Sequence, residues 1–260
     1  MERYSELIEL PSQGRLYDGK LPGGEIEIYA MGVEEESMLI GKNNKTEASR
    51  ALDRLIERCI KTDFPIDELL VSDRFYIFLM IRKISYGSIY DYFVTCPNCG
   101  DKVSQHVDIP GSFNVTLLDE GVTEPFYTDL PMCKKRVGFK LLRMKDETDT
   151  QMYSRNQRRV SKNSDINHEY LYRIAKHIVS VDDIVDGDLD QKITNISITE
   201  ALEFVRTLIG RDSSKLKSAI AKNDCGIDLK FDTDCNSCGE EFKTSLEFTA
   251  EFFRPESDEV

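Results

Sequence analysis

The sequence reads Cys96-Pro97-Asn98-Cys99-Gly100 at one point and Cys235-Asn236-Ser237-Cys238-Gly239 at another, and these two matching turns are its strongest indication of the fold. A β-like run enters each turn, Tyr92-Phe93-Val94-Thr95 in the first and Leu229-Lys230-Phe231-Asp232 in the second. Strands joined in this way build a zinc knuckle, in which the glycine lets backbone amides point at the sulfurs. Because four thiolates satisfy tetrahedral Zn²⁺ without an open position, we expect a structural site. The predicted ligands of one Zn²⁺ per chain are Cys96, Cys99, Cys235 and Cys238.

The remaining cysteines and one histidine give weaker signals. Cys59, Cys133 and Cys225 lack the paired spacing, and an isolated reduced cysteine is usually a small buried apolar residue. His106 follows Cys99 closely enough to replace one thiolate, although a histidine that alternates with valine is typical of an ordinary strand residue. Two further interpretations of the paired turns stay open: four unrelated reduced cysteines, or separate metal sites completed by other molecules. Closure within one chain avoids the free-energy cost of association and favours a single shared site.

A shared metal has a consequence for topology, because the stretch from Asp101 to Asp234 becomes an insertion between the two hairpins of one zinc ribbon. The predicted fold class is α+β, with an N-terminal strand-plus-helices region and a four-cysteine zinc ribbon that is split by a mixed, mainly helical insertion. Three parts are expected: residues 1–100 ending in the first knuckle, an inserted lobe at 101–226 with short strands and then helices, and residues 227–260 with the second knuckle and an acidic tail.

Hydrophobic periodicity indicates the elements of the N-terminal part. Residues 25–29 alternate like a strand, whereas three- and four-residue spacings between 34 and 87 predict helices. The most apolar stretch, Phe75 to Ile84, is expected to be a buried helix. Gly87 is a natural C-cap for it, and Arg82 is expected to help orient the knuckle that follows.

Short β-like runs continue from 100 to 143, and helical patterns then return. Thr199 and Ser213 are possible starts of the last two helices. The predicted helices of this part are 145–162, 168–179, 199–209 and 213–222.

The formal net charge of −13 repels a nucleic-acid backbone, which usually selects faces rich in Lys and Arg. This charge counts against the nucleic-acid binding for which many zinc ribbons are used. A solvated helix face or an acidic protein partner explains the one basic cluster at least as well. That cluster comprises Arg155, Arg158, Arg159 and Lys162, after the basic run Lys134-Lys135-Arg136.

Neither a membrane span nor an export signal is indicated. No stretch reaches the roughly 18 consecutive apolar residues that a membrane helix requires. The first six residues lack the basic start and apolar core of a signal peptide. We therefore expect the protein to stay in the cytosol without membrane insertion, where seven cysteines favour metal binding over disulfides.

The sequence lacks motifs that would indicate an enzyme. It contains no His-Glu-x-x-His and no Gly-x-Ser-x-Gly. Gly41-Lys42-Asn43 lacks the glycine spacing and the Ser/Thr of a phosphate-binding loop, and the acidic run from Asp182 to Asp190 does not follow the ligand order of an EF-hand. We expect no catalytic residues, no cofactor-binding residues and no small-molecule substrate. The alternative is an enzyme whose pocket lies in the inserted lobe.

The order of several short motifs resembles the baseplate hub and hub-assembly proteins of T4-like contractile-tailed bacteriophages. The resemblance covers mainly residues 8–100, and the second knuckle extends it to the C-terminal region, whereas 101–226 shows no match. The motifs are Leu10-Pro11-Ser12-x-Gly14-x-x-Tyr17, Glu34-Glu35-Glu36, Asp73-Arg74-x-Tyr76, Ile81-Arg82-x-x-Ser85-Tyr86-Gly87 and Cys96-x-x-Cys99.

The resemblance implies a non-enzymatic late protein that binds other tail baseplate or hub proteins, either in the virion or during viral tail assembly in the host cytoplasm. The alternative function is a zinc-ribbon protein that binds nucleic acid or a transcription complex. Leu10-Pro11-Ser12 has two interpretations: an extended segment that docks on a partner, or a turn before the strand at 25–29.

Overall fold

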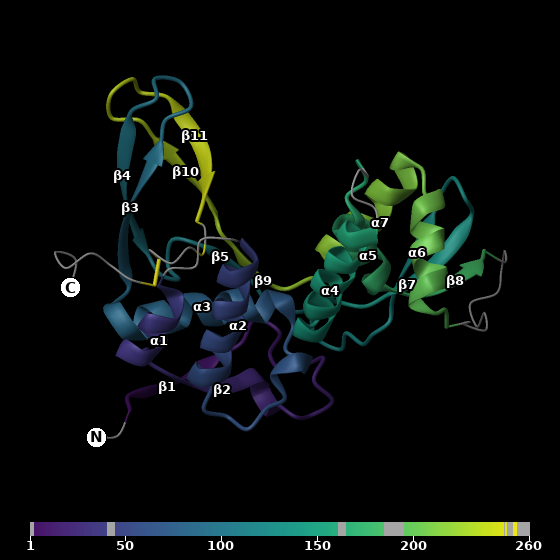
Figure 1. Cartoon of the computed structure of the whole chain (residues 1–260), viewed down its shortest axis with the longest axis horizontal. Helices are drawn as coiled ribbons and strands as arrows, with labels where there is room; N and C mark the ends of the chain where they lie inside the picture. The colour runs from purple at the N-terminus through teal and green to yellow at the C-terminus, as the bar shows by residue number, and fades with distance from the viewer. Residues whose placement is uncertain are drawn as a thin grey trace. The chain divides into compact units, whose positions relative to one another are not determined.

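A computed structural model describes residues 3–40, 45–160, 165–184, 195–246, 248 and 252–253 of the chain. The chain is α+β, as predicted (Figure 1). It forms two compact units: the first combines Met1–Phe64, Ser72–Leu117 and Cys225–Val260, and the second combines Pro65–Val71 and Leu118–Asp224. The division into three parts stays a prediction, because compactness does not show which parts fold independently. Lys162, Asp186 to Asp190 and the acidic tail at 256–260 lie outside the described residues.

Over its described residues, the first unit consists of short two-stranded sheets and three α-helices. Its sheets pair β1 with β2, β3 with β4, β5 with β9, and β10 with β11, all antiparallel. The bounds are β1 (Ser5–Glu9), β2 (Glu25–Tyr29), β3 (Ile89–Thr95), β4 (Lys102–Asp108), β5 (Asn114–Thr116), β9 (Gly226–Asp228), β10 (Lys230–Asp234), β11 (Glu241–Ser245), α1 (Val33–Leu39), α2 (Lys45–Cys59), α3 (Val71–Tyr86) and the 3₁₀ turn η1 (Pro22–Gly24).

The segment between β1 and β2 folds back onto α3 through a buried carboxylate. Asp73 is fully buried, and its two oxygens accept hydrogen bonds from Ser12 N–H at 3.0 Å and from Tyr17 O–H at 2.6 Å. Leu10 and Ser12 are themselves fully buried. The partner-docking interpretation of Leu10-Pro11-Ser12 is therefore wrong, because this segment is a turn that packs inside its own chain.

Helix α3 forms the core of the first unit, as its apolar sequence predicted. Its apolar side chains are buried around most of its circumference, including Ile77, Phe78 and Ile81. Arg82, only 1% exposed, donates from Nε to the carbonyl of Phe252 at 3.0 Å and from Nη1 to that of Gly87 at 3.2 Å. Gly87 ends the helix at a φ of 94°, which confirms the predicted C-cap.

The second unit packs helices on a three-stranded antiparallel sheet of order β6-β7-β8. Side chains alternate along β6, where Phe126, Thr128 and Leu130 are buried, and helices α5, α6 and α7 contact the strands. The bounds are β6 (Phe126–Leu130), β7 (Lys135–Phe139), β8 (Ile178–Asp183), α4 (Met144–Val160), α5 (His168–His177), α6 (Ile198–Thr207), α7 (Gly210–Lys222) and the 3₁₀ turn η2 (Ile66–Glu68).

The four helices predicted here exist, but several of their ends were placed wrongly. Helix α5 ends at His177 instead of 179, because the β-branched residues that follow pair with β7. Helix α6 begins after Ser197, whose side chain caps the helix in a capping box with Glu200. Helix α7 begins at Gly210 instead of Ser213.

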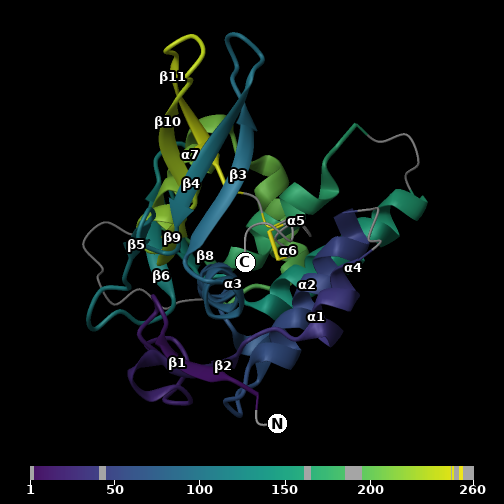
Figure 2. The same ribbon diagram turned by 90° about the vertical axis from the view of Figure 1, so that its left-hand side faces the viewer.

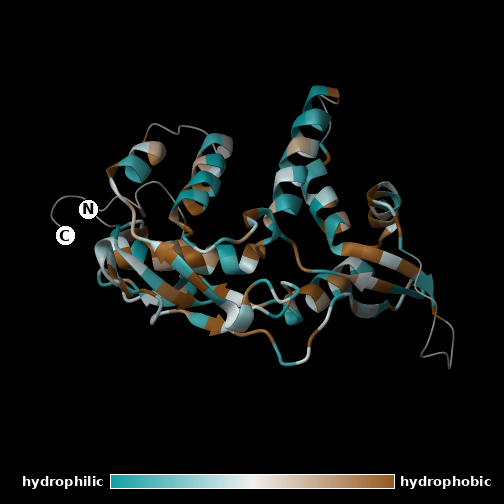
Figure 3. Ribbon diagram, turned by 90° about the horizontal axis from the view of Figure 1, so that it is seen from below, coloured by the Kyte–Doolittle hydropathy of each residue, from teal (hydrophilic) through white to brown (hydrophobic). Residues whose placement is uncertain are grey.

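Within the described ranges, no helix has both the length and the apolar composition needed to cross a membrane. Hydrophilic residues interrupt the hydrophobic ones along the helices (Figure 3).

Candidate metal centre

The first half of the candidate metal centre is the turn that joins β3 to β4. The ladder between these strands runs from Ile89 opposite Asp108 to Thr95 opposite Lys102. Cys96 N–H then donates to the carbonyl of Asp101 at 2.9 Å, and Gly100 N–H donates to the carbonyl of Cys96 at 3.0 Å.

The second half repeats this geometry at the turn between β10 and β11. Cys235 N–H donates to the carbonyl of Glu240 at 2.9 Å, and Gly239 N–H donates to the carbonyl of Cys235 at 2.8 Å. Both turn glycines have positive φ, 78° at Gly100 and 73° at Gly239, so the predicted role of glycine holds in each turn. The two hairpins lie side by side although the whole stretch of β5 to β9 separates them in sequence (Figures 1 and 2).

The four cysteine sulfurs converge between the hairpin tips. All of them lie within 4.8 Å of one another, with 3.7 Å between the Sγ atoms of Cys96 and Cys238 and 3.6 Å between those of Cys99 and Cys235. Four thiolates about 2.3 Å from a tetrahedral Zn²⁺ would lie about 3.8 Å apart. The arrangement therefore fits a zinc-ribbon-like site and can hold a metal ion.

Each hairpin contributes one buried and one exposed cysteine. Cys96 and Cys235 are each 1% exposed and form a small core with Val103, against which Val94 and Phe242 pack. Cys99 and Cys238 are exposed. This apolar core is small, so a metal ion bound here would add to the contacts between the two hairpins.

The two cysteines of the first turn differ in how readily their thiols ionise. Backbone amides of Cys99 and then Asn98 hydrogen-bond to Cys96 and lower the pKa of its thiol to about 7. The Asp101 amide lowers the pKa of Cys99, but burial and hydrogen bonds with the sulfurs of Cys235 and Cys238 outweigh it and raise that pKa to about 12. The pKa values of Cys96 and Cys99 thus shift in opposite directions, and a divalent cation would neutralise the charge of thiolates at this site.

One further contact reaches the cluster from outside the four cysteines, and it was missed in the sequence. Asn98 Nδ2 donates to the Sγ of Cys238 across the two hairpins at 3.6 Å. Its position inside the first Cys-x-x-Cys turn was the available signal, since a donor there can reach the opposite sulfur.

His106 and the other cysteines lie apart from the cluster. His106 is exposed on β4 and its Nδ1 contacts Asp91, the residue opposite it on β3. Arg3 lies beside the buried thiol of Cys59, the buried Cys225 lies beside Ser72, and the exposed Cys133 donates its backbone N–H to Asp212.

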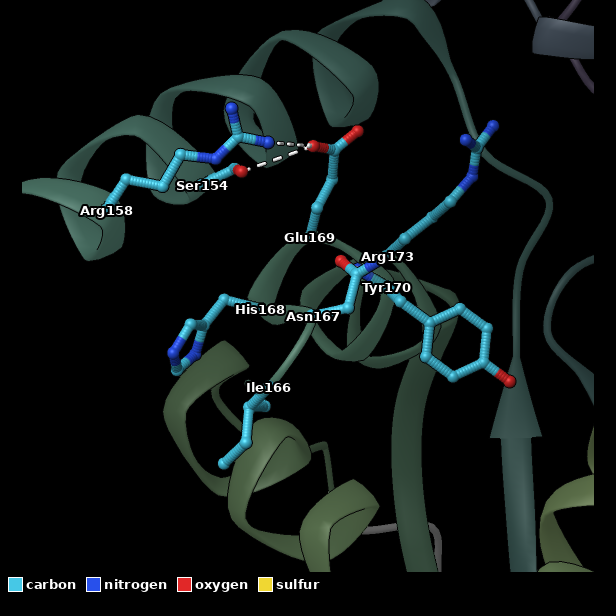
Figure 4. Close-up of a pocket in the computed structure, with 8 residues that line it drawn as sticks. All are labelled: Ser154, Arg158, Ile166, Asn167, His168, Glu169, Tyr170 and Arg173. Atoms are coloured by element: carbon cyan, nitrogen blue, oxygen red, sulfur yellow. Dashed lines mark hydrogen bonds and ion pairs between the residues drawn. The ribbon is translucent and has the colours of Figure 1, made fainter. Parts of the chain in front are cut away.

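The second unit contains a pocket of about 410 Å³ between α4 and α5, the part of the chain in which the enzyme alternative placed its pocket (Figure 4). Ser154 Oγ on α4 donates to Glu169 on α5 at 3.2 Å, and Arg158 lies 3.8 Å from the same carboxylate. Asn167 caps α5 by accepting the N–H of Tyr170 at 3.0 Å. These contacts place Ser154, Arg158 and Glu169 at a junction between the two helices.

Two residues of the basic run that precedes the cluster have acidic neighbours. Lys135 pairs with Asp183 at 2.7 Å, and Arg136 pairs with Asp129 at 2.8 Å. Arg158 of the cluster also lies near a carboxylate, that of Glu169, and ion pairs of this kind are typical of a solvated protein surface.

The fold and the site together define an α+β protein with a cysteine cluster fit for a metal between two hairpins. Comparison with protein families matches residues 5–254 to the family described as T4 bacteriophage base plate protein. The chain belongs to this family, which confirms the resemblance drawn from the sequence. No curated protein and no solved structure matches the chain.

Membership in the family identifies the chain as a structural protein of the bacteriophage baseplate. It also indicates contacts with other baseplate proteins. The match includes the residues from 101 to 226 that the short motifs left unassigned.

Proposed function

We propose that the chain is a non-enzymatic component of the baseplate hub, or a factor that assembles the hub, and that it acts through contacts with other baseplate proteins. The observation that carries this proposal is the family match over residues 5–254. The charge of −13 agrees with protein partners and opposes binding to a nucleic-acid backbone.

Zinc is the metal we propose for the cysteine cluster. The ligand set would be Cys96, Cys99, Cys235 and Cys238, with one Zn²⁺ per chain. Sulfur ligands select Zn²⁺ over the hard cations Mg²⁺ and Ca²⁺, and four protein ligands leave no position for a substrate. The ion would therefore fix the two hairpins to each other and would supply no reaction chemistry.

The test of function compares purified virions with infected cells. Mass spectrometry of virions is run beside a pull-down that uses the tagged full-length chain during infection. A permanent hub component should be found in virions, and its pull-down should contain other baseplate proteins. Detection only in the pull-down would identify an assembly factor.

Two other results would overturn the proposal. The first is absence of the chain from virions together with absence of baseplate proteins from the pull-down. The second is salt-dependent binding of the purified chain to DNA or RNA, which would favour the zinc-ribbon nucleic-acid binder instead.

A further inference from the structure

A groove of about 340 Å³ runs along β1 in the first unit. Six consecutive residues form one side of it, from Glu6 to Pro11. The rest of the lining comes from α3 and from the end of β5 with the residues just after it, namely Tyr76, Met80, Val115 and Leu117.

The side of the groove formed by β1 is an open strand edge. On the β2 side, the carbonyl of Tyr4 accepts a hydrogen bond from Ala30 N–H, and Leu10 N–H donates to the carbonyl of Gly24. Since bonding direction alternates along an antiparallel strand, the backbone groups of Leu7 point away from β2. Over the described residues β1 pairs with β2 alone. Such an edge is a template for one more strand.

Apolar side chains make the walls and floor of the groove. Leu7 is 58% exposed and Leu117 is 52% exposed, although both are large aliphatic residues. Met80 is buried on α3, one turn after Tyr76, so both side chains face the same side of that helix. A segment laid along β1 would cover apolar surface on three sides.

The groove is acidic as well as apolar. Glu9 is exposed and has no ion-pair partner among the residues the structure describes, and Glu6 has only Lys83 at 4.0 Å. Both carboxylates lie near Tyr76: burial raises the pKa of Tyr76, and Glu9 and then Glu6 raise it further. A segment with cationic side chains would complement this charge, whereas an acidic one would be repelled.

We propose that another baseplate protein docks an extended segment in this groove as an added strand on β1, with apolar side chains alternating with lysine or arginine. About six residues would fill it, because a strand rises about 3.3 Å per residue and six residues of this chain line the edge. This inference rests on the proposed function and adds to it the place and the chemistry of the partner.

Synthetic ten-residue peptides test the proposal on the full-length chain. One alternates valine with lysine, one alternates valine with glutamate, and one is the valine–lysine peptide with alternate backbone nitrogens methylated. Because the chain contains no tryptophan, a tryptophan at the end of each peptide reports binding by fluorescence anisotropy without background. The valine–lysine peptide should bind, while the glutamate and N-methylated peptides should bind at least about tenfold more weakly.

Matched variants locate the binding site. Leu7→Ser and Leu117→Ser should each weaken binding of the valine–lysine peptide about tenfold, which is about 1.4 kcal/mol, because each substitution removes apolar side-chain surface that the peptide would cover. Glu9→Lys should weaken it further than Glu9→Gln does. Met152→Ser is the control, since Met152 is 50% exposed on α4 and does not line the groove.

Four results of the peptide-binding measurements would overturn the inference. They are no binding by any peptide, equal binding by the N-methylated peptide, equal binding by the glutamate peptide, and equal loss in Met152→Ser. If no peptide binds, the carboxylates of Glu6 and Glu9 only protect the edge of β1 against pairing with another strand. A dimer in sedimentation that Leu7→Ser dissociates would assign the groove to a second copy instead. A chain that captures baseplate proteins but no peptide would refute the groove and leave the proposed function intact.

Discussion

Gly14 and Gly19 have the same backbone conformation but different surroundings. Their φ values are 72° and 75°, a region that costs a residue with a side chain about 1–2 kcal/mol. A Cβ at Gly14 would lie 1.9 Å from the carbonyl oxygen of Leu21, whereas one at Gly19 would meet nothing within 4 Å. The turn that brings Ser12 and Tyr17 to Asp73 therefore has no room for a side chain at Gly14, whereas it has room for one at Gly19.

Alanine substitution should separate the two effects. Gly19→Ala should lower the free energy of unfolding by about 1 kcal/mol, from backbone conformation alone. Gly14→Ala should lower it by more than about 3 kcal/mol, because the turn must open to admit the methyl group. Urea denaturation measures both, and equal losses would show that the close approach of Leu21 to Gly14 is not present in solution.

His177 should make the stability of the second unit depend on pH. Burial lowers its pKa from about 6.5 to about 4, and its Nδ1 contacts the carbonyl of Lys140 at 2.8 Å. The unfolded chain binds a proton near pH 6.5, whereas the folded chain binds it only near pH 4. Stability is therefore constant for this group above about pH 6.5 and falls by up to about 3 kcal/mol as the pH drops to 4.

The variant His177→Asn isolates this contribution. Its side-chain amide can still donate to the Lys140 carbonyl but does not titrate. Unfolding free energies measured from pH 7.5 to pH 4.5 should fall less steeply in the variant than in the wild type. Carboxylates titrate in both proteins, so the difference between the two curves reports His177, and parallel curves would contradict its buried neutral state.

Local patterns in the sequence predicted the helices and hairpins that depend mainly on residues close together in the chain. The spacing of apolar residues identified α3 and the helices of the second unit, and the two Cys-x-x-Cys-Gly turns identified their hairpins. The capping box at Ser197 was also readable, but Thr199 was preferred as the helix start.

Contacts between distant residues were not predictable in this way. Strand β5 pairs with β9 although Leu118–Asp224 lies between them in the sequence, and β8 pairs with β7 although α4 and α5 lie between them in the sequence. Short strands gain most of their stability from such partners, so their own sequences carry a weak signal. The hydrogen bonds of the Asp73 carboxylate could not be predicted either, because its partners Ser12 and Tyr17 come from another part of the chain.

The hairpins should respond to metal removal separately from the second unit. A chelator added to the zinc-loaded chain should increase amide hydrogen exchange in β3, β4, β10 and β11. The sheet β6-β7-β8 should keep its protection, since the predicted ligands all belong to the first unit. Hydrogen exchange with mass spectrometry distinguishes this from a uniform increase, which would mean that the metal holds the entire fold.

For the molecule as a whole, the cysteine cluster brings together two hairpins that lie far apart in the sequence. The main segment of the second unit, Leu118–Asp224, separates the two hairpins in sequence, yet both belong to the first unit. A metal between their tips would join the two parts of the first unit that this long insertion separates.

The metal content of the reduced full-length chain is the sharpest test of a shared zinc site. Native mass spectrometry after zinc loading and removal of excess metal should find one Zn²⁺ per chain in the wild type. The control Cys133→Ser, whose exposed thiol lies outside the cluster, should also retain one. Cys99→Ser should retain none. A wild-type chain without zinc, or a Cys99→Ser chain that keeps it as firmly as the wild type, would contradict the shared site.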